Sequence, residues 1–192
     1  LLQRAANLEV IGQASAGLKL LARLPDDGAR NDRELTLQLM RGAAFWAVEG
    51  FSSAQVETAF TRARELADAC RDSGRLFVAL RGLFGCYYGR GQLRRASKQA
   101  GEVIALAVKT GSRGDMCVGQ LLAGQIALWR GKPVEARQYL ESALANYDEG
   151  EQQARMLSSQ IDPAVNAGIH LGWALWTLGL PDRALAVAGA AL

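Results

Sequence analysis

The chain has 192 residues, of which 49% are hydrophobic and 21% are charged, a balance typical of a soluble globular protein. Its formal net charge of +3 speaks against a dedicated nucleic-acid-binding protein, which is usually more basic and gathers its charge on one face. We therefore expect no nucleic-acid partner.

The cysteines and the lengths of the apolar segments exclude further classes of protein. Cys70, Cys86 and Cys117 are odd in number and widely spaced, so neither a disulfide framework nor a CxxC metal site can be drawn from them. We expect small buried thiols in a reducing, cytoplasmic compartment. Because no apolar run is long enough to span a bilayer, no transmembrane helix is expected. The chain begins with Leu1 in place of a methionine and stops inside the apolar helical pattern LAVAGAAL, which predicts a fragment of a longer polypeptide.

Apolar residues recur at helical spacing through most of the chain, and β-branched residues are sparse. Both features favour α-helix throughout. The expected helices cover residues 1–24, 31–49, 54–70, 75–89, 93–110, 116–130, 133–147, 163–178 and 181 onward. Polar residues that could cap helix starts are Asn31 with Glu34, Ser52 with Gln55, Ser112 with Asp115, and Asp162 before Pro163. A polar stretch at 148–160 interrupts the pattern.

A helix-turn-helix unit recurs about every 40 residues. Its turn is marked by Gly50, Gly91, Gly131 and Gly179. An alanine follows the last three glycines by five residues, at Ala96, Ala136 and Ala184. Glycine permits a backbone that a β-carbon would obstruct, and the alanine lets the second helix pack closely on the first. Two helices per repeat of this size indicate an α-solenoid.

The offsets of these small and aromatic residues match the tetratricopeptide (TPR) pattern, although the period exceeds the usual ~34 residues. We therefore predict an all-α fold, an α-solenoid of TPR-like antiparallel helix pairs wound as a right-handed superhelix with longer-than-usual repeats. One domain is expected over 1–192. Its approximate repeats are a partial one at 1–30 and full ones at 31–72, 73–111, 112–147 and 161–192.

The sequence shows no chemistry of its own. The single histidine, His170, has no Ser-His-Asp, Cys-His or metal-ligand pattern around it, and no phosphate-binding glycine motif is present. We expect His170 to be a packing residue, with no catalytic residue, cofactor site or metal site in the chain. The basic run of Arg90, Arg94, Arg95 and Lys98 is interpreted as a solvated outer face in preference to an anion-binding patch.

The first helix of each pair lines the concave groove in TPR solenoids, where extended partner segments bind. Counting from the turn glycines, the groove-facing candidates are Arg81, Tyr88, Gln125, Trp129, Asn166, Trp173 and Trp176. Aromatic and arginine residues are the types that anchor interfaces. The competing interpretation is that the tryptophans are buried between repeats, where a solenoid packs large side chains.

Several short motifs carry a more specific resemblance. They are Tyr147-Asp148, Asp162-Pro163, Ala174-Leu175-Trp176 and the turn GLPDRAL at 179–185, with further support from GFSSAQVETAFTRARELADAC and LRGLFGCYYGRGQLRRA. Together they resemble the TPR region that follows an AAA-type ATPase module in multidomain bacterial class III adenylate/guanylate cyclases. None of the matched residues is a cyclase or ATPase catalytic residue, so the resemblance implies a non-enzymatic fragment.

Three hypotheses follow for function. The first is a cytoplasmic scaffold or regulatory region of a nucleotide cyclase, binding a protein partner or other domains of the same polypeptide. The second is the TPR region of an ATPase-containing transcriptional regulator. The third is a small-molecule-sensing solenoid with a pocket lined by Trp129, Trp173 and Trp176. The oligomeric state stays open, and no membrane partner is expected.

Overall fold

The structure is a computed structural model that describes residues 2–25, 27–148, 150 and 162–190. Within these residues it consists of helices and turns, without a strand. Internal contacts divide the chain into unit 1, Leu1–Gln99, and unit 2, Ala100–Leu192, and each unit is considered by itself. The predicted all-α repeat architecture is confirmed.

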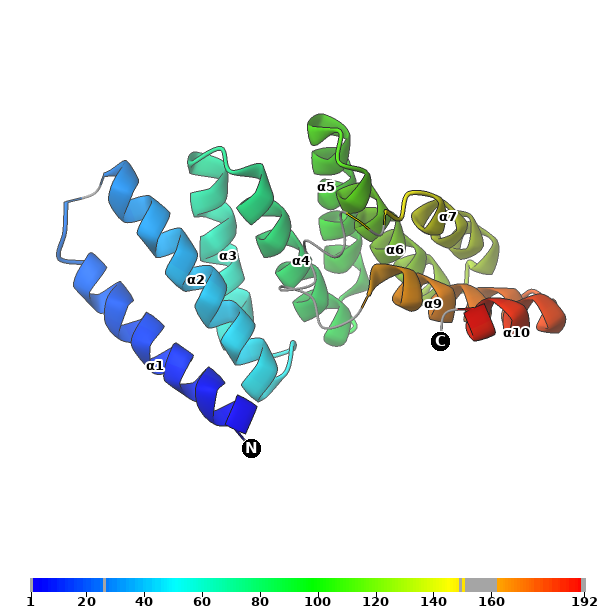
Figure 1. Cartoon of the computed structure of the whole chain (residues 1–192), viewed down its shortest axis with the longest axis horizontal. Coiled ribbons are helices and arrows are strands. Elements are labelled where there is room, and N and C mark those ends of the chain that lie inside the picture. Colours follow the sequence, from blue (N-terminus) through cyan, green and yellow to red (C-terminus); the bar gives the residue numbers. More distant parts are fainter. Residues whose placement is uncertain (1, 26, 149, 151–161, 191–192) are drawn as a thin grey trace. The chain divides into compact units, whose positions relative to one another are not determined.

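Unit 1 is a series of antiparallel helices, of which the first four each pack on the next (Figure 1). Its helices are α1 (Leu2–Leu21), α2 (Gly28–Glu49), α3 (Ala54–Ala69), α4 (Ser73–Gly89) and the first part of α5 (Leu93–Thr110). Successive contacts join α1 to α2, α2 to α3 and α3 to α4, and α2 also contacts α4. Its core is formed by Leu35, Ala63, Leu66, Ala67 and Ala79.

Unit 2 contains the rest of α5 and four further helices, α6 (Arg113–Trp129), α7 (Pro133–Ala145), α9 (Pro163–Thr177) and α10 (Pro181–Ala190). Contacts join α6 to α7, α7 to α9 and α9 to α10, and the first helices of the two pairs, α6 and α9, also touch. Small and branched side chains fill the space between them. The core includes Cys117, Leu121, Leu140, Leu171 and Leu175.

The turn glycines have the role that the sequence assigns to them. Gly50, Gly91, Gly131 and Gly179 have φ angles of 85°, 69°, 70° and 75°. In this left-handed region a β-carbon is strained, so glycine is the residue that turns the chain without cost. The alanines that follow, Ala96, Ala136 and Ala184, are buried at the contact between paired helices, as predicted.

Helices α2, α4 and α6 begin two or three residues earlier than predicted, and two of the predicted caps are replaced by other residues. Helix α2 begins at Gly28, where Asp27 is the N-cap and its Oδ1 accepts a hydrogen bond of 2.7 Å from the Arg30 amide. Asn31 is already inside the helix, because its amide donates to the Asp27 carbonyl at 3.0 Å. The cap of α3 is Ser53, not Ser52. The caps expected at Ser112 and Asp162 are confirmed.

The cysteines are free thiols: Cys86 and Cys117 are buried and Cys70 is half-buried. Burial raises the pKa of Cys117 to about 11, so the thiol is protonated at neutral pH and behaves as a small apolar side chain. The expectation of buried cysteines therefore holds for two of the three. Of the predicted polar interruption at 148–160, only Asp148 and Gly150 belong to the described residues.

Candidate functional site

One stripe of α9 carries polar and aromatic side chains, and two of them, Asn166 and His170, contact the neighbouring α6. Asn166, His170, Trp173 and Thr177 recur at helical spacing, so they share a face. The helix is fixed at its start by Asp162, whose Oδ1 accepts from the amides of Ala164 at 2.7 Å and Val165 at 3.3 Å. Its end is set by the turn at Gly179, described above. The N-cap at Asp162 and the turn at Gly179 thus fix where α9 begins and ends.

The facing residues of α6 are Gln125 and Trp129, four positions apart. We call the surface built by both helices the α6–α9 face. It comprises Gln125, Trp129, Asn166, Ile169, His170, Trp173 and Trp176. Five of the seven residues predicted from sequence thus lie on two touching helices of one unit.

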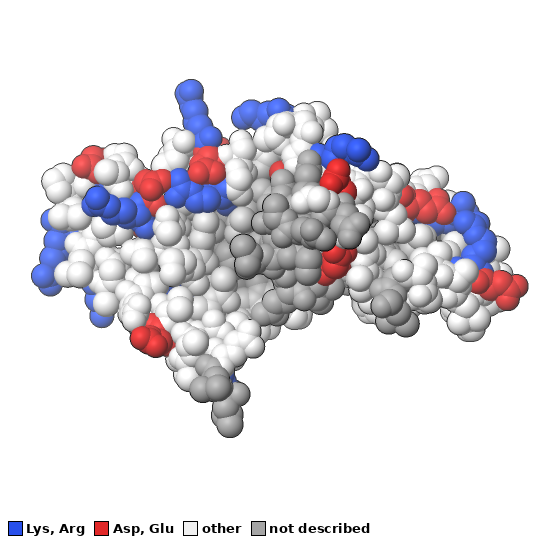
Figure 2. Space-filling view, viewed as in Figure 1, with Lys and Arg blue, Asp and Glu red and all other residues white. Residues whose placement is uncertain are grey.

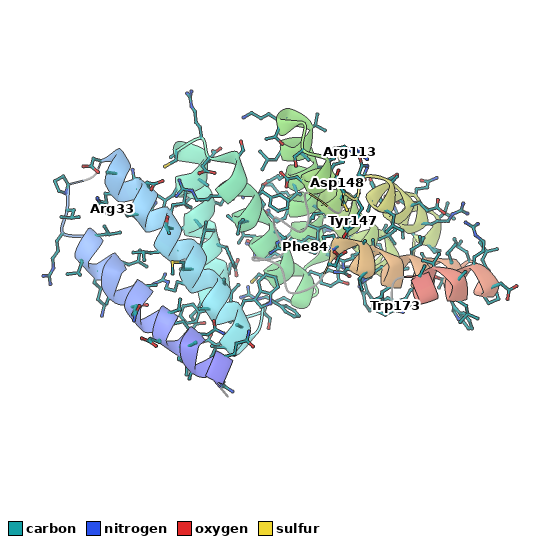
Figure 3. The ribbon with its side chains drawn as sticks, in the orientation of Figure 1. Arg33, Phe84, Arg113, Tyr147, Asp148 and Trp173 are labelled. Carbon is teal, nitrogen blue, oxygen red and sulfur yellow. The ribbon has the colours of Figure 1, made fainter. Side chains whose placement is uncertain are left out.

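The tryptophans of this face are exposed. Trp129, Trp173 and Trp176 have 60%, 52% and 64% of their surface accessible, and Ile169 has 39%. Figure 3 labels Trp173 on α9. The interpretation that these indoles are buried between repeats is therefore wrong. The fourth tryptophan, Trp46 in unit 1, is instead half-buried and packs edge-on against Phe60 with ring centroids 6.5 Å apart.

A polar cluster lies beside the tryptophans. The Nε2 atom of Gln125 donates to Asn166 Oδ1 at 3.3 Å and lies 3.4 Å from His170 Nε2. On the other side of the ring, His170 Nδ1 lies 2.8 Å from the backbone carbonyl oxygen of Asn166. A carbonyl only accepts, so Nδ1 carries the proton and Nε2 accepts from Gln125. Trp173 packs edge-on against this imidazole at 5.0 Å.

His170 was not predicted as a member of this site. It is buried and hydrogen-bonded, which confirms the expectation of a packing residue, and it also joins Asn166 to Trp173. Its position four residues after Asn166 and three before Trp173 was the available signal. Helical spacing placed it on their face, but its chemistry alone indicated nothing beyond packing.

Acidification is expected to destabilise the protein through His170. Burial lowers the pKa of His170 below its ordinary value of 6.5, and the hydrogen bond to Asn166 offsets this only in part. The unfolded chain therefore binds the proton at a higher pH than the folded chain does. Stability is complete above the unfolded pKa and falls as pH drops from about 6.5 through the folded pKa. Urea unfolding followed by circular dichroism at steps from about pH 7 to about pH 5 measures the loss.

His170→Gln provides the control, because His170 is the single histidine of the chain. The carboxylates with lowered pKa values, such as Glu34 and Asp72, lose their contribution only below their own unfolded values near 4. In the window above about pH 5, the His170→Gln protein should therefore show little pH dependence. An equal slope in both proteins would contradict the assignment.

The α6–α9 face lacks charge. From Met116 to Trp129 and from Pro163 to Thr177 the sequence contains no Lys, Arg, Asp or Glu. Charged residues of unit 2 lie elsewhere, such as Lys132, Glu135 and Glu141 at the start of and within α7 and Arg183 on α10. Figure 2 shows blue and red atoms at the end of the molecule where Figure 1 labels these two helices. A ligand on this face therefore meets indole rings, an aliphatic side chain and amide groups.

The two remaining predicted residues, Arg81 and Tyr88, lie on α4 in unit 1. Tyr88 is half-buried and stacks on Phe84 with ring centroids 5.4 Å apart. Arg81 is also half-buried, and burial lowers the pKa of its guanidinium from the ordinary value. Both residues are therefore packed more closely than the tryptophans of unit 2, and the α6–α9 face is the better-supported candidate.

The basic run of unit 1 is not simply a solvated face. Arg90 pairs with Glu57 and donates to the Ser52 carbonyl at 2.8 Å, and Arg95 reaches the same carboxylate at 3.3 Å. The guanidinium of Arg95 also lies over the Tyr87 ring, 4.3 Å from its centroid. Burial alone would raise the pKa of Glu57, but the two arginines outweigh it and hold the pKa below its ordinary value. Two members of the run thus tie α3 to α4 and the start of α5.

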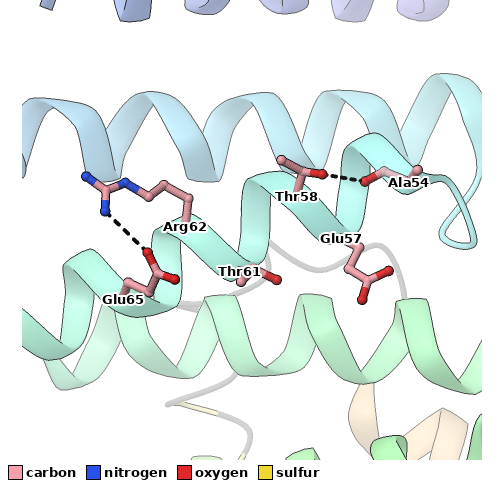
Figure 4. A pocket seen from close by; sticks show the side chains of 6 residues that line it. All are labelled: Ala54, Glu57, Thr58, Thr61, Arg62 and Glu65. Carbon is pink, nitrogen blue, oxygen red and sulfur yellow. Dashed lines mark hydrogen bonds and ion pairs between the residues drawn. The ribbon is translucent and has the colours of Figure 1, made fainter. Parts of the chain in front are cut away.

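A hollow of about 470 Å³ on α3 carries no chemistry of its own. Figure 4 shows its lining, which comes from α3 alone: Ala54, Glu57, Thr58, Thr61, Arg62 and Glu65. All three charged members belong to ion pairs, Glu57 with Arg90 and Arg62 with both Glu34 and Glu65. The charged side chains of the hollow are therefore already engaged within the protein. Among the residues the structure describes, no three His, Cys, Asp or Glu side chains are grouped to hold a metal ion.

No helix in the described ranges is long and apolar enough to cross a bilayer.

Comparison with known proteins identifies the fold. No family model matches the chain, and no curated protein matches it either. Two solved structures of TPR-like repeats from a Podosopora anserina kinesin light chain are similar, one of them a variant of the other. Both are 18% identical over 98% of this chain and 91% of theirs, with TM-scores of 0.63 and 0.61. At this identity the likeness shows the TPR-like repeat fold alone.

Proposed function

We propose that this chain is a non-catalytic helical-repeat scaffold that binds a segment of a protein, supplied by a partner or by another domain of its own polypeptide. The binding surface is the α6–α9 face. The observation that carries the proposal is the exposure of Trp173 and Trp176 on one side of α9. Indoles on a surface forgo a large gain from burial, and tryptophan is enriched among the residues that dominate interface energies.

The support extends beyond two side chains. Trp129 brings a third indole from the neighbouring helix, and Ile169 adds an exposed branched side chain. Exposed large apolar side chains gathered on two touching helices mark interaction sites on soluble proteins. The first helices of adjacent repeats supply all of it, which is the surface that a helical-repeat scaffold uses to engage an extended segment.

Selection from a random-peptide display library tests this function. The purified chain is the bait, and the same chain carrying Trp173→Ala and Trp176→Ala is the counter-bait. We expect peptides that bind the parent chain and lose at least about tenfold in affinity for the variant. Retention of the parent's circular dichroism spectrum shows that the variant is folded. Peptides that bind both chains equally, or an absence of enriched peptides, would contradict the proposal.

We further propose, from the sequence resemblance, that the scaffold belongs to a cytoplasmic multidomain adenylate/guanylate cyclase with an AAA-type ATPase module. Two residues that carry the resemblance contact each other, since the Tyr147 hydroxyl donates to Asp162 Oδ2 at 2.7 Å. A third, Trp176, belongs to the α6–α9 face. Sequencing the full gene is the test. A DNA-binding domain in the flanking sequence would support the transcriptional-regulator alternative instead.

The small-molecule alternative is favoured by the same exposed indoles. It predicts that the enriched peptides compete with a free aromatic compound for the α6–α9 face. Calorimetric titration of the chain with free indole, with and without a selected peptide, distinguishes the two. Micromolar binding of indole itself would support the alternative, whereas binding of peptides alone supports the scaffold.

A further inference from the structure

We propose that two copies of this chain associate through the α6–α9 face, with α9 of one copy packed on α9 of the other about a twofold axis. This goes beyond the proposed function, because it concerns what covers the face when no partner segment is bound. The second copy and the partner segment then compete for the same indoles. Three features of the face lead to this occupant: its place in the repeat, its lack of charge and its area.

The repeat shows that the exposed side of α9 corresponds to a helix-packing surface. The turn glycines of the last two repeats are 48 residues apart, so each position of α6 has a counterpart 48 residues later on α9. Leu121 and Gln125 of α6 are 4% and 6% exposed. Leu121 lies in the core that α6 shares with α7 and α9, and Gln125 donates to Asn166 of α9. Their counterparts, Ile169 and Trp173, are 39% and 52% exposed. The last described repeat thus leaves uncovered the positions that the repeat before it buries.

The uncovered side chains form one ridge along α9. Ile169, Trp173 and Trp176 follow one another at spacings of four and three residues, and the half-buried Val165 precedes them by four. In the described part of the chain α6, α7 and α10 pack on α9, and they leave Ile169 and both indoles exposed. Side chains four residues apart form the ridges that fit into the grooves of a facing helix. A second α9 brings a ridge of the same spacing.

The lack of charge favours a second copy over an unlike partner. A twofold contact brings each group of the interface near its own counterpart, so a charged group there would meet a like charge. The sequence contains no Lys, Arg, Asp or Glu from Met116 to Trp129 or from Pro163 to Thr177, so this repulsion is absent. Unlike partners gain specificity and association rate from opposite charges, which these two stretches do not supply. The net charge of +3 is small, so two whole chains repel each other only weakly.

The exposed area is sufficient for a weak dimer. A tryptophan side chain buries up to about 250 Å². Because more than half of the surface of Trp129, Trp173 and Trp176 is accessible, these indoles and Ile169 together offer roughly 500 Å² per chain. Two copies therefore bury roughly 1,000 Å², the total that a specific interface should reach. For a contact of this size without ion pairs we expect a dissociation constant of about 10–100 μM.

Sedimentation velocity over a concentration series from about 1 μM to about 300 μM tests the association. We expect a shift from monomer to dimer, which should not weaken when the salt concentration is raised, because no ion pairs are screened. Trp173→Ala combined with Trp176→Ala should weaken the dimer at least about tenfold. Val108→Ala is the matched control: Val108 is 68% exposed on α5, outside the face, and its truncation should leave the dissociation constant unchanged. Circular dichroism checks that the variants are folded.

Crosslinking tests where the two copies meet. Cys86 and Cys117 are buried, so Cys70→Ser removes the remaining accessible thiol. In this background Ile169→Cys, in the middle of the ridge, should give a covalent dimer with a short bis-maleimide crosslinker. Val108→Cys, at the control position, should give much less. Equal crosslinking at the two positions would contradict a contact through α9.

The outcomes separate this inference from the proposed function. A chain that sediments as a monomer throughout the series would overturn the inference, and the peptide selection would still test the scaffold function. A dimer that persists in the double tryptophan variant, or an open-ended series of larger species, would also overturn the inference. An indole-dependent dimer together with an absence of enriched peptides would contradict the proposed function alone. Where both hold, an enriched peptide should dissociate the dimer.

Discussion

Replacing Leu140 by alanine is expected to lower the free energy of unfolding by about 2–5 kcal/mol. Leu140 is fully buried on α7 in the core of unit 2, among Leu121, Leu171 and Leu175. Truncation removes apolar contacts and leaves a cavity that α6 and α9, the helices packed against α7, cannot fully close. Urea unfolding monitored by far-ultraviolet circular dichroism measures the change.

Leu185→Ala is the control of identical chemistry in the same unit. Leu185 is 68% exposed, so its truncation should change the free energy of unfolding by no more than about 0.5 kcal/mol. The contrast isolates burial from the effect of leucine on helix formation. Similar losses in the two variants would show that unit 2 does not have its core where the structure places it.

Glycine-to-alanine substitution is expected to have opposite signs at two helical positions of unit 2. A β-carbon at Gly124 would lie 2.6 Å from Leu140 Cγ and 3.4 Å from the Ala136 carbonyl oxygen, so α6 and α7 would have to separate. Overpacking of this kind costs about 1–3 kcal/mol. At Gly101 in α5 nothing lies within 4 Å of the added β-carbon, and alanine should stabilise the helix by about 0.5–1 kcal/mol.

Urea unfolding again measures the effect, and the sign of the change in the free energy of unfolding decides between the outcomes. A combined Gly124→Ala and Leu140→Ala variant sharpens it, because the smaller side chain at 140 makes room for the new methyl group. Its destabilisation should be less than the sum of the two single effects. Stabilisation by Gly124→Ala, or strict additivity in the double variant, would contradict the close approach of the two helices.

The sequence predicted the repeat because its signals are local and act through sterics. A glycine at positive φ, such as Gly131, and an alanine at the helix contact, such as Ala136, each have few substitutes. Helix starts were less predictable where two capping residues compete. Asp27 and Asn31 are both good caps, and the structure uses the earlier one, with Asn31 inside the helix. Nothing in either residue's own propensity ranks those two outcomes.

The sequence predicted most of the residues of the candidate site, but it did not predict whether their side chains are exposed. Helical spacing from the turn glycines placed Gln125, Asn166 and Trp173 on one face, and the structure brings them together. Whether an indole on that face packs between repeats or points to solvent depends on the distance between α6 and α9, which periodicity does not specify. His170 was missed as a site member for a related reason, since its role depends on which side chains surround it.

Three of the four tryptophans of the chain lie on the α6–α9 face, and the fourth, Trp46, is half-buried in unit 1. The protein therefore has intrinsic fluorophores at its proposed binding surface. Indole emission shifts to shorter wavelength and becomes less open to collisional quenchers when water leaves the ring. Binding of any ligand to that face should therefore change the intrinsic tryptophan fluorescence without an added dye. The emission of Trp46 should stay nearly constant.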